Sequence, residues 1–435
     1  MLSRRSFISL TGATAALSVT PLSAQRRGGA EATGPVPPSI MALTSMRAQA
    51  KPITVEERRA RLDKARRLMT EQKIDAIILT GGTSLNYFTG IRWGNSERLT
   101  AVVIPKVGNP YIVTPAFEED RTREQLVGGP MEHTDVAIWQ EDESPFERVA
   151  TGLKDRGIAT GRIGIEETSK FVFADSISGA APALKIVSAS PIVAGCRMIK
   201  SPHELELMRL ASQVTLKCYE AVFKALKPGM TQNDASSLIN AGYARLGFQG
   251  FASIQVGEYT ALPHGSITPQ TIREGTIIMI DDGCTAEGYQ SDITRTFVIG
   301  KATDKMKKVF DIVHQAQTAA LKAARPGVAL ESIDAAGRKV VVDAGYGPGF
   351  KYFSHRLGHG MGMDGHEWPY LVKNNMFGWE KALTMQAGMV FSDEPGIYIK
   401  GEFGVRLEDD MHVTENGAEL FTPQSPSIED PFGAA

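Results

Sequence analysis

Cysteine is scarce in this chain: Cys196, Cys218 and Cys284 are the only three, and no two of them form a CxxC pair. Such an odd and sparse set indicates neither a disulfide framework nor a thiolate-rich metal site. Basic residues are not in excess either, since 47 lysines and arginines stand against 49 aspartates and glutamates. With a formal charge of -2, the composition gives no sign of a protein that coats nucleic acid.

The N-terminus carries only a short apolar run. Residues 9–19 fall short of the roughly 20 residues that a membrane-spanning helix needs, and glycine and threonine interrupt them. Arg4 and Arg5 precede this run, and small residues follow it up to Ala24, so residues 1–24 resemble a twin-arginine export signal. We therefore expect a periplasmic or secreted protein with no membrane association after signal removal. A membrane anchor or a first helix is the alternative.

The length of 435 residues is too great for one ordinary hydrophobic core, so at least two domains are expected. A hydrophobic content of 42% and a charged content of 22% are typical of a soluble globular protein. Residues 25–53 are rich in glycine and proline, which predicts a linker or an arm over the surface. Short apolar strand patterns with helical patterns between them predict an α/β domain over residues 54–198.

A second domain is predicted over residues 199–425. Ser201-Pro202 is a good helix start, because serine caps a helix and proline fits its first turn. Pairs of strand patterns alternate with two pairs of amphipathic helices, which are expected at 203–226, 232–246, 305–324 and 331–344. This alternation predicts an α+β domain with an internal duplication.

Five good metal ligands lie in this second domain, each in a stretch that reads as a strand or a strand edge: Asp281, Asp292, His359, Glu394 and Glu408. Four carboxylates and one imidazole form an oxygen-rich set that suits a pair of divalent cations. Taken singly, each has a structural alternative. Asp281 could begin a turn, and Glu408 could form a solvent-facing salt bridge with Arg406.

Three of the eight histidines, His355, His359 and His366, fall within twelve residues of a glycine-lined stretch. Glycine supplies no hydrophobic face and a neutral imidazole needs partners, so core packing is an unsatisfactory explanation. We expect one of the three to be a metal ligand and the others to contact substrate. A surface loop with incidental histidines is the alternative.

Taken together and in order, these fragments resemble the pita-bread metallopeptidase family, which includes aminopeptidase P, the Xaa-Pro dipeptidases, methionine aminopeptidase and the metal-free creatinase. The matching segments are Asp281 with Gly283, residues 288–296, Gly358-His359-Gly360, Glu394-Pro395-Gly396 and Arg406-Leu407-Glu408-Asp409. The resemblance implies an α+β pita-bread catalytic domain with internal pseudo-duplication, preceded by a smaller α/β creatinase-type N-terminal domain. It also implies a homodimer, since members commonly dimerise.

The resemblance implies a role for each matched residue. Asp281 would bind one metal through both oxygens, Asp292 and Glu408 would bridge two metals, and His359 and Glu394 would complete the shells. A metal-bridging hydroxide would then attack the scissile carbonyl, and Glu394 would help to move a proton to the leaving amine. The further catalytic candidates are His264, His355, His366 and Arg406. Two Mn²⁺ ions are expected, although Co²⁺, Zn²⁺ or Fe²⁺ would satisfy the same ligands.

The resemblance therefore implies an enzyme that cuts the peptide bond before proline, either an Xaa-Pro aminopeptidase or an Xaa-Pro dipeptidase. The intact ligand set argues against creatinase, and the large N-terminal domain argues against methionine aminopeptidase. A non-peptidase hydrolase or lyase acting on a peptide or small molecule remains an alternative, as does a non-catalytic binding module.

Several features depart from the family pattern. Ser392-Asp393 precedes Glu394 where threonine or an apolar residue is more frequent, and two single residues also differ. Arg356 stands where glycine is common, and Asp282 adds an acid beside Asp281. Arg356 is expected to pair with a substrate carboxylate or with Asp364, or to form a salt bridge on its own loop.

Overall fold

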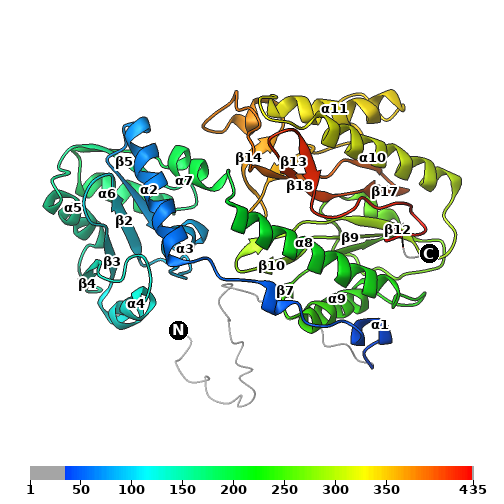
Figure 1. Ribbon diagram of the computed structural model, residues 1–435, viewed down its shortest axis with the longest axis horizontal. Helices are drawn as coiled ribbons and strands as arrows, with labels where there is room; N and C mark the ends of the chain where they lie inside the picture. Colours follow the sequence, from blue (N-terminus) through cyan, green and yellow to red (C-terminus); the bar gives the residue numbers. More distant parts are fainter. Residues whose placement is uncertain (1–34, 434–435) are drawn as a thin grey trace, which may run out of the picture.

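The computed structural model describes residues 35–433. The signal predicted for residues 1–24 lies outside the described residues. Two lobes are visible along the long axis in Figure 1, one built from residues 55–197 and the other from the later residues together with the N-terminal arm. Within the described residues, no helix combines the length and apolarity that crossing a membrane requires.

The N-terminal domain is a six-stranded mixed sheet with the strand order β4-β3-β2-β1-β5-β6. Its strands are β1 (Ala76–Thr80), β2 (Ala101–Pro105), β3 (Tyr111–Pro115), β4 (Asp135–Trp139), β5 (Gly161–Ile165) and β6 (Leu184–Ser188). The helices around the sheet are α2 (Val55–Gln72), α3 (Thr83–Thr89), α4 (Glu119–Leu126), α5 (Pro145–Asp155), α6 (Phe171–Ala180) and α7 (Ser190–Arg197). Side chains of β1 alternate between two hydrophobic clusters, one on each face, so the strand is buried throughout.

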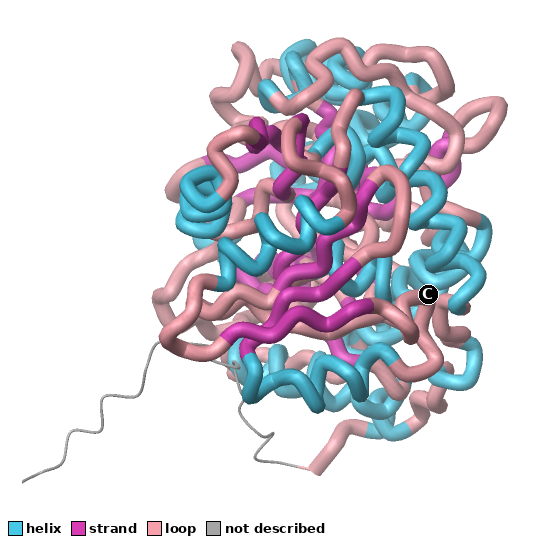
Figure 2. The backbone as a smooth tube through the Cα atoms, turned by 90° about the vertical axis from the view of Figure 1, so that its left-hand side faces the viewer, coloured by secondary structure: helices cyan, strands magenta, loops and turns pink. Residues whose placement is uncertain are grey.

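Two helix pairs form the outer layers of the catalytic domain: α8 (Pro202–Phe223) with α9 (Gln232–Leu246), and α10 (Asp304–Ala323) with α11 (Leu330–Asp343). The start of α8 is a capping box, in which Ser201 and Glu204 bond each other's backbone N–H groups. Short antiparallel strands lie between the two helix pairs (Figures 1 and 2). This arrangement confirms the predicted α+β class, and the two helix pairs begin and end within three residues of their predicted limits.

The strands that carry the candidate ligands belong to separate small sheets. One has the order β12-β9-β8, from β8 (Ser253–Val256), β9 (Ile277–Asp281) and β12 (Arg295–Val298). Another has the order β14-β13-β15-β18-β19, from β13 (Gly358–Gly360), β14 (Glu367–Leu371), β15 (Val390–Asp393), β18 (Asp409–Val413) and β19 (Ala418–Leu420). The hairpin of β16 (Gly396–Ile399) with β17 (Phe403–Arg406) and the sheet of β7 (Gln249–Gly250), β10 (Cys284–Ala286) and β11 (Tyr289–Gln290) complete the domain.

The strand predicted from Ser291 to Ile299 is shorter in the structure, because β12 begins only at Arg295. The backbone N–H of Asp292 donates to the carboxylate of Asp410 at 3.2 Å instead of joining a strand ladder. Asp292 therefore lies in a loop whose conformation is fixed by another part of the chain.

The described part of the N-terminal arm packs along the catalytic domain before it reaches α2. Its short helix α1 (Pro38–Met41) lies against α8 and α9, and Ile40 is fully buried there. The Ser39 hydroxyl donates to the carbonyl of Ala221 at 2.7 Å, and the N–H of Met46 donates to the carbonyl of Leu246 at 2.9 Å.

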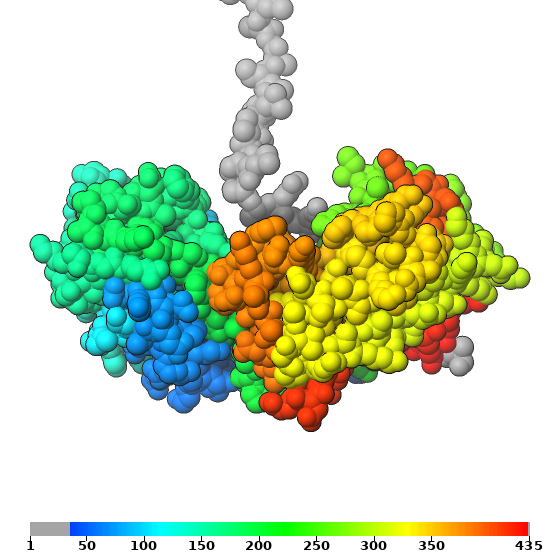
Figure 3. All heavy atoms as spheres, turned by 90° about the horizontal axis from the view of Figure 1, so that it is seen from above, coloured from blue at the N-terminus to red at the C-terminus, as the bar shows by residue number. Residues whose placement is uncertain are grey.

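The two domains meet through buried charged groups. Arg61 of α2 donates to Glu204 at 3.0 Å and to the Tyr289 hydroxyl at 2.7 Å. Further along the same boundary, Lys200 donates to Glu367 at 2.9 Å. In the space-filling view of Figure 3, the residues drawn in orange fill the space between the two lobes. The start of β14 is therefore held from the N-terminal side.

Candidate metal centre

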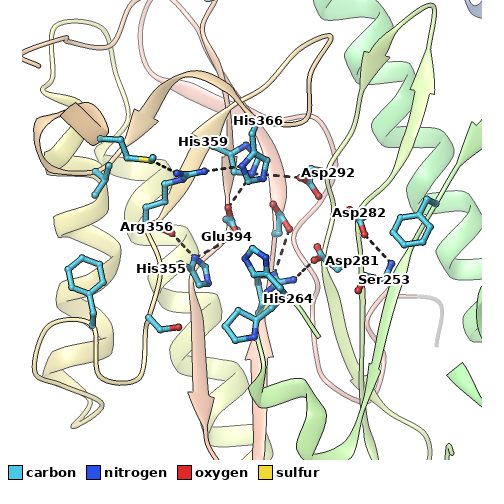
Figure 4. A pocket seen from close by; sticks show the side chains of 18 residues that line it. Ser253, His264, Asp281, Asp282, Asp292, His355, Arg356, His359, His366 and Glu394 are labelled. Atoms are coloured by element: carbon cyan, nitrogen blue, oxygen red, sulfur yellow. Dashed lines mark hydrogen bonds and ion pairs between the residues drawn. The ribbon is translucent and has the colours of Figure 1, made fainter. Parts of the chain in front are cut away.

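The structure brings all five predicted ligands together, although they come from five different places in the catalytic domain. Asp281 ends β9, His359 is the middle residue of β13, and Glu394 directly follows β15. Asp292 and Glu408 lie in the short connections before β12 and before β18. Figure 4 shows the carboxylates of Asp292 and Glu394 turned toward the ring of His359.

Their donor atoms form overlapping groups. Asp281, Asp292 and Glu408 offer three oxygens that all lie within 4.8 Å of one another, and so do ligand atoms of His359, Glu394 and Glu408. Glu408 belongs to both groups. Two adjacent cation positions that share a carboxylate are what such overlap would provide.

Glycine makes the position of His359 possible. A side chain at Gly358 would place its Cβ 2.0 Å from the carbonyl oxygen of Ser392, and one at Gly360 would lie 2.5 Å from the carbonyl oxygen of Glu367. Only residues without a Cβ fit there, because β13 lies between β14 and β15. The segment Gly358-His359-Gly360 is therefore an internal strand and not a surface loop, whereas His366, further along the glycine-lined stretch, is exposed.

The crowded acids are strongly perturbed. Burial raises the pKa of Asp292 and of Glu408 well above the usual range, and the neighbouring carboxylates raise them further. Burial likewise raises the pKa of Glu394 to about 7. In the absence of cations these groups hold protons to avoid buried like charges. Divalent cations would remove that conflict, so the donor set fits them.

Asp281 behaves differently from the other acids. Burial acts to raise its pKa, but the guanidinium of Arg406 and the hydroxyl of Thr294 together lower it below the usual value. Arg406 is only 3% exposed, and its Nη2 pairs with Asp281. The alternative of a solvent-facing salt bridge at Arg406 is therefore wrong: the side chain points inward and holds Asp281 charged.

The remaining predicted catalytic residues line the same cavity, whose volume is about 750 Å³. His264 lies on the loop after the short helix at Gly257–Ala261 and lines the cavity (Figure 4). His366 stacks on His359, with ring centroids 3.7 Å apart. His355 is hydrogen bonded through both ring nitrogens, and burial lowers its pKa to about 3.

The hydrogen bonds around His355 determine which of its ring nitrogens carries the proton. Arg406 donates to the Tyr398 hydroxyl at 3.0 Å, so that hydroxyl donates its own proton to His355 Nε2 at 2.7 Å. Nδ1 of His355 then carries the ring proton and donates it to the carbonyl of Arg356 at 2.7 Å. His355 is a neutral wall residue of the cavity with both nitrogens occupied.

Several supporting residues were not predicted from the sequence. The Thr294 hydroxyl lies 2.5 Å from Asp281 Oδ1 and 2.6 Å from Glu408 Oε2, and the Ser392 hydroxyl accepts the N–H of His359 at 3.0 Å. Asp410 accepts the N–H of Asp292. Thr294, Ser392 and Asp410 each stand two positions from a ligand. Alternate strand residues share a side, so this spacing was the available signal.

The two residues that depart from the family pattern both line the cavity. Arg356 does not pair with Asp364, which instead accepts from Arg197 at 2.6 Å and from Thr83 at 2.5 Å. That predicted pairing is wrong because Arg197 of α7 reaches Asp364 across the domain boundary. The carboxylate of Asp282 accepts the N–H of Ser253 at 3.1 Å, which leaves it beside the candidate ligands.

Comparison with known proteins identifies the family of the chain. Residues 61–199 match the creatinase/prolidase N-terminal domain, and residues 206–415 match metallopeptidase family M24. A Xaa-Pro dipeptidase of Lactobacillus helveticus is 31% identical over 369 residues, which cover 83% of this chain and 96% of that protein.

Solved structures give the same result. Dipeptidase PepE from Mycobacterium ulcerans superposes with a TM-score of 0.79 at 30% identity, covering 87% of this chain and 99% of the other. A prolidase from Thermococcus sibiricus does so with a TM-score of 0.74 at 27% identity, covering 86% and 98%.

The chain therefore belongs to metallopeptidase family M24, with a creatinase-type N-terminal domain. This confirms the family and the pita-bread fold expected from the sequence. The protein is a metal-dependent peptidase, and the family implies divalent cations in a site with this donor set.

The protonation of the site predicts how the metal-free protein responds to pH. Between pH 7.5 and 8.5 the unfolded acids are ionised and the unfolded histidines are almost entirely neutral, whereas folded Asp292 and Glu408, whose pKa values are raised well above the usual range, bind more protons than in the unfolded chain. The folded state therefore binds more protons, so its stability falls as the pH rises. Below about pH 7.5 the histidines, whose pKa values are lowered on folding, oppose this trend.

We expect chelated protein to lose unfolding free energy, on the order of 1 kcal/mol, between pH 7.5 and 8.5. Protein loaded with metal should lose much less, because the ligands are then ionised throughout. Denaturant unfolding at a series of pH values measures both. A chelated protein whose stability is constant or rises over this range would contradict the assignment.

Proposed function

We propose that this protein is a dinuclear-metal hydrolase that cleaves the peptide bond before proline, acting chiefly on Xaa-Pro dipeptides. The observation that supports two metals is the convergence of five ligands into two groups that share Glu408. The support for proline and for dipeptides comes from the relatives, which include the Xaa-Pro dipeptidase of L. helveticus and the prolidase of T. sibiricus.

Each ligand has a distinct part in this proposal. Asp281 would hold one cation, His359 and Glu394 would hold the other, and Asp292 and Glu408 would contribute to both. When bound, two divalent cations would supply a water activated as hydroxide near neutral pH and a polarised scissile carbonyl. Mn²⁺ is the proposed native ion.

The protein's own groups then provide binding and proton transfer. Glu394 sits beside His359, with its Oε1 3.3 Å from Nε2 of the ring, and would carry a proton toward the leaving imide nitrogen of proline. His264 and His366 face the cavity from opposite sides, where they would contact the substrate and its developing oxyanion. Arg406 keeps Asp281 ionised and so ready to bind a cation.

Metal dependence is directly testable at the shared site. Chelation should abolish Xaa-Pro hydrolysis, and added Mn²⁺ should restore it. Asp292→Asn should lose at least one ion per chain and lower kcat by about 100-fold or more, because a bridging oxygen loses its charge. Asp311→Asn, on the exposed surface of α10, is the matched control and should bind metal normally. Full metal content in Asp292→Asn would count against its bridging role.

The choice of substrate needs a side-by-side assay. An Xaa-Pro dipeptide, a longer peptide with proline second and a non-prolyl dipeptide should be compared at equal concentration. We expect the Xaa-Pro dipeptide to have a kcat/KM at least about 10-fold above the other two, since a dedicated site can discriminate by a few kcal/mol. Preference for the longer peptide would make the protein an Xaa-Pro aminopeptidase. Failure to cleave either prolyl substrate would overturn the proposal in favour of another hydrolase or a lyase.

We also propose export by the twin-arginine route, supported by Arg4 and Arg5 ahead of the short apolar run. Replacing both arginines by lysine should retain the protein in the cytoplasmic fraction, whereas an unchanged distribution would rule out this route.

We propose that the protein is a homodimer, because members of the family commonly dimerise. Sedimentation at the mass of a single chain would contradict it.

A further inference from the structure

One ring nitrogen of His366 lies beside a group that can only donate hydrogen bonds. Nη2 of Arg356 lies 3.0 Å from Nδ1 of His366. A guanidinium has five N–H donors and no acceptor, so Nδ1 of His366 must be the acceptor in this contact. A histidine that accepts at Nδ1 is neutral and carries its proton on Nε2. The contact therefore selects one tautomer.

The position of His366 allows this tautomer to donate a hydrogen bond beside the metal centre. The ring lines the cavity and stacks on His359 at an interplanar angle of 22°. One of its nitrogens lies within 4.8 Å of ligand atoms of both Asp292 and His359. The ring can then offer one N–H at the edge of the metal centre.

Arg356 is itself held in place by two contacts besides His366. Its guanidinium carbon lies 4.2 Å from the centroid of the Tyr370 ring, a cation–π geometry that fixes the plane of the group. Its Nη1 contacts the sulfur of Met376. Among the ion pairs of residues 35–433, none includes Arg356. The guanidinium is thus oriented by soft contacts and not by an acid.

The Met376 contact depends on an unusual piece of backbone. Residues 374–377 are four consecutive non-glycine residues with positive φ, at 56°, 44°, 50° and 59°. Such a left-handed turn costs roughly 1–2 kcal/mol per residue, and it persists only where its surroundings impose it. Here Asn375 is only 2% exposed; its side chain accepts the N–H of Tyr370 at 2.7 Å and donates to the carbonyl of Glu380 at 2.9 Å.

We propose that Arg356 is a positioning residue that keeps His366 in the Nε2–H tautomer, so that His366 donates a hydrogen bond to the substrate carbonyl oxygen as negative charge develops on it. The Tyr370 ring and the left-handed turn at residues 374–377 aim the guanidinium for this purpose. The expected effect on kcat rests on the proposed hydrolytic function. The tautomer of His366 is a property of the protein without substrate and does not rest on it.

Two readouts test the proposal. The first is the ¹⁵N NMR spectrum of histidine-labelled, Zn²⁺-loaded protein, in which the His366 signals are identified by their loss in His366→Gln. Wild type and Arg356→Lys, which keeps a donor, should show the Nε2–H form of His366. Arg356→Met should show a mixture of tautomers. An unchanged Nε2–H signal in Arg356→Met would overturn the proposal.

The second readout is steady-state kinetics on an Xaa-Pro dipeptide. Arg356→Met should lower kcat by about 10- to 100-fold, with KM within about 3-fold of wild type, because a transition-state donor is lost. The same substitution should have little further effect in a His366→Gln background. Arg356→Lys should recover most of kcat. Lys351→Met removes an exposed cation next in sequence to the cavity-lining Phe350 and should leave both constants unchanged.

The alternative role for Arg356, pairing with a substrate carboxylate, gives a different pattern. It would raise KM for the free dipeptide but not for its C-terminal amide, with kcat unchanged, and that result would overturn the positioning role. If wild-type protein cleaves no prolyl substrate at all, the proposed function fails. The NMR result then still decides whether Arg356 sets the tautomer of His366.

Discussion

The structure depends on keeping four carboxylates within a few ångströms of one another in a largely buried place. Like charges at such distances strongly disfavour full ionisation when water is excluded. The raised pKa values of Asp292, Glu394 and Glu408 express that conflict in the metal-free protein. Divalent cations would relieve it, so the arrangement that is unfavourable alone would become a strong binding site when loaded.

The groups around the ligands offset part of the repulsion between the carboxylates and hold the neighbouring segments in place. Arg406 supplies one fixed positive charge against Asp281, and Thr294 lies between Asp281 and Glu408. At the domain boundary, Arg197 and Lys200 hold Asp364 and Glu367, the residues on either side of the Gly365-His366 corner. The N-terminal domain thus contributes no ligand, but it helps to fix the hairpin on which His366 stands.

Many of the helix limits and all five candidate ligands could be predicted from local sequence patterns. The helix at 232–246 has the predicted limits, because Thr231 caps its start and Gly247 ends it in a left-handed conformation. The ligands could be found because each has a short motif of fixed spacing. Their roles as ligands remain predictions until metal is seen.

What the sequence did not reveal is nonlocal. Asp292 leaves the predicted strand because Asp410, 118 residues away, accepts its N–H. Asp364 takes Arg197 as its partner, 167 residues away, and not the nearby Arg356. The left-handed turn at residues 374–377 contains no glycine to signal it, because buried Asn375 and the contacts of its side chain impose the backbone there. Such features follow from tertiary packing and leave little trace in residue patterns.

The most direct test of the account is an anomalous-diffraction map of crystals grown with Mn²⁺. The account predicts two ions per chain, one at Asp281 and the other at His359 and Glu394, with Asp292 and Glu408 in contact with both. A single ion at full occupancy, or a second ion that does not touch Glu408, would contradict it.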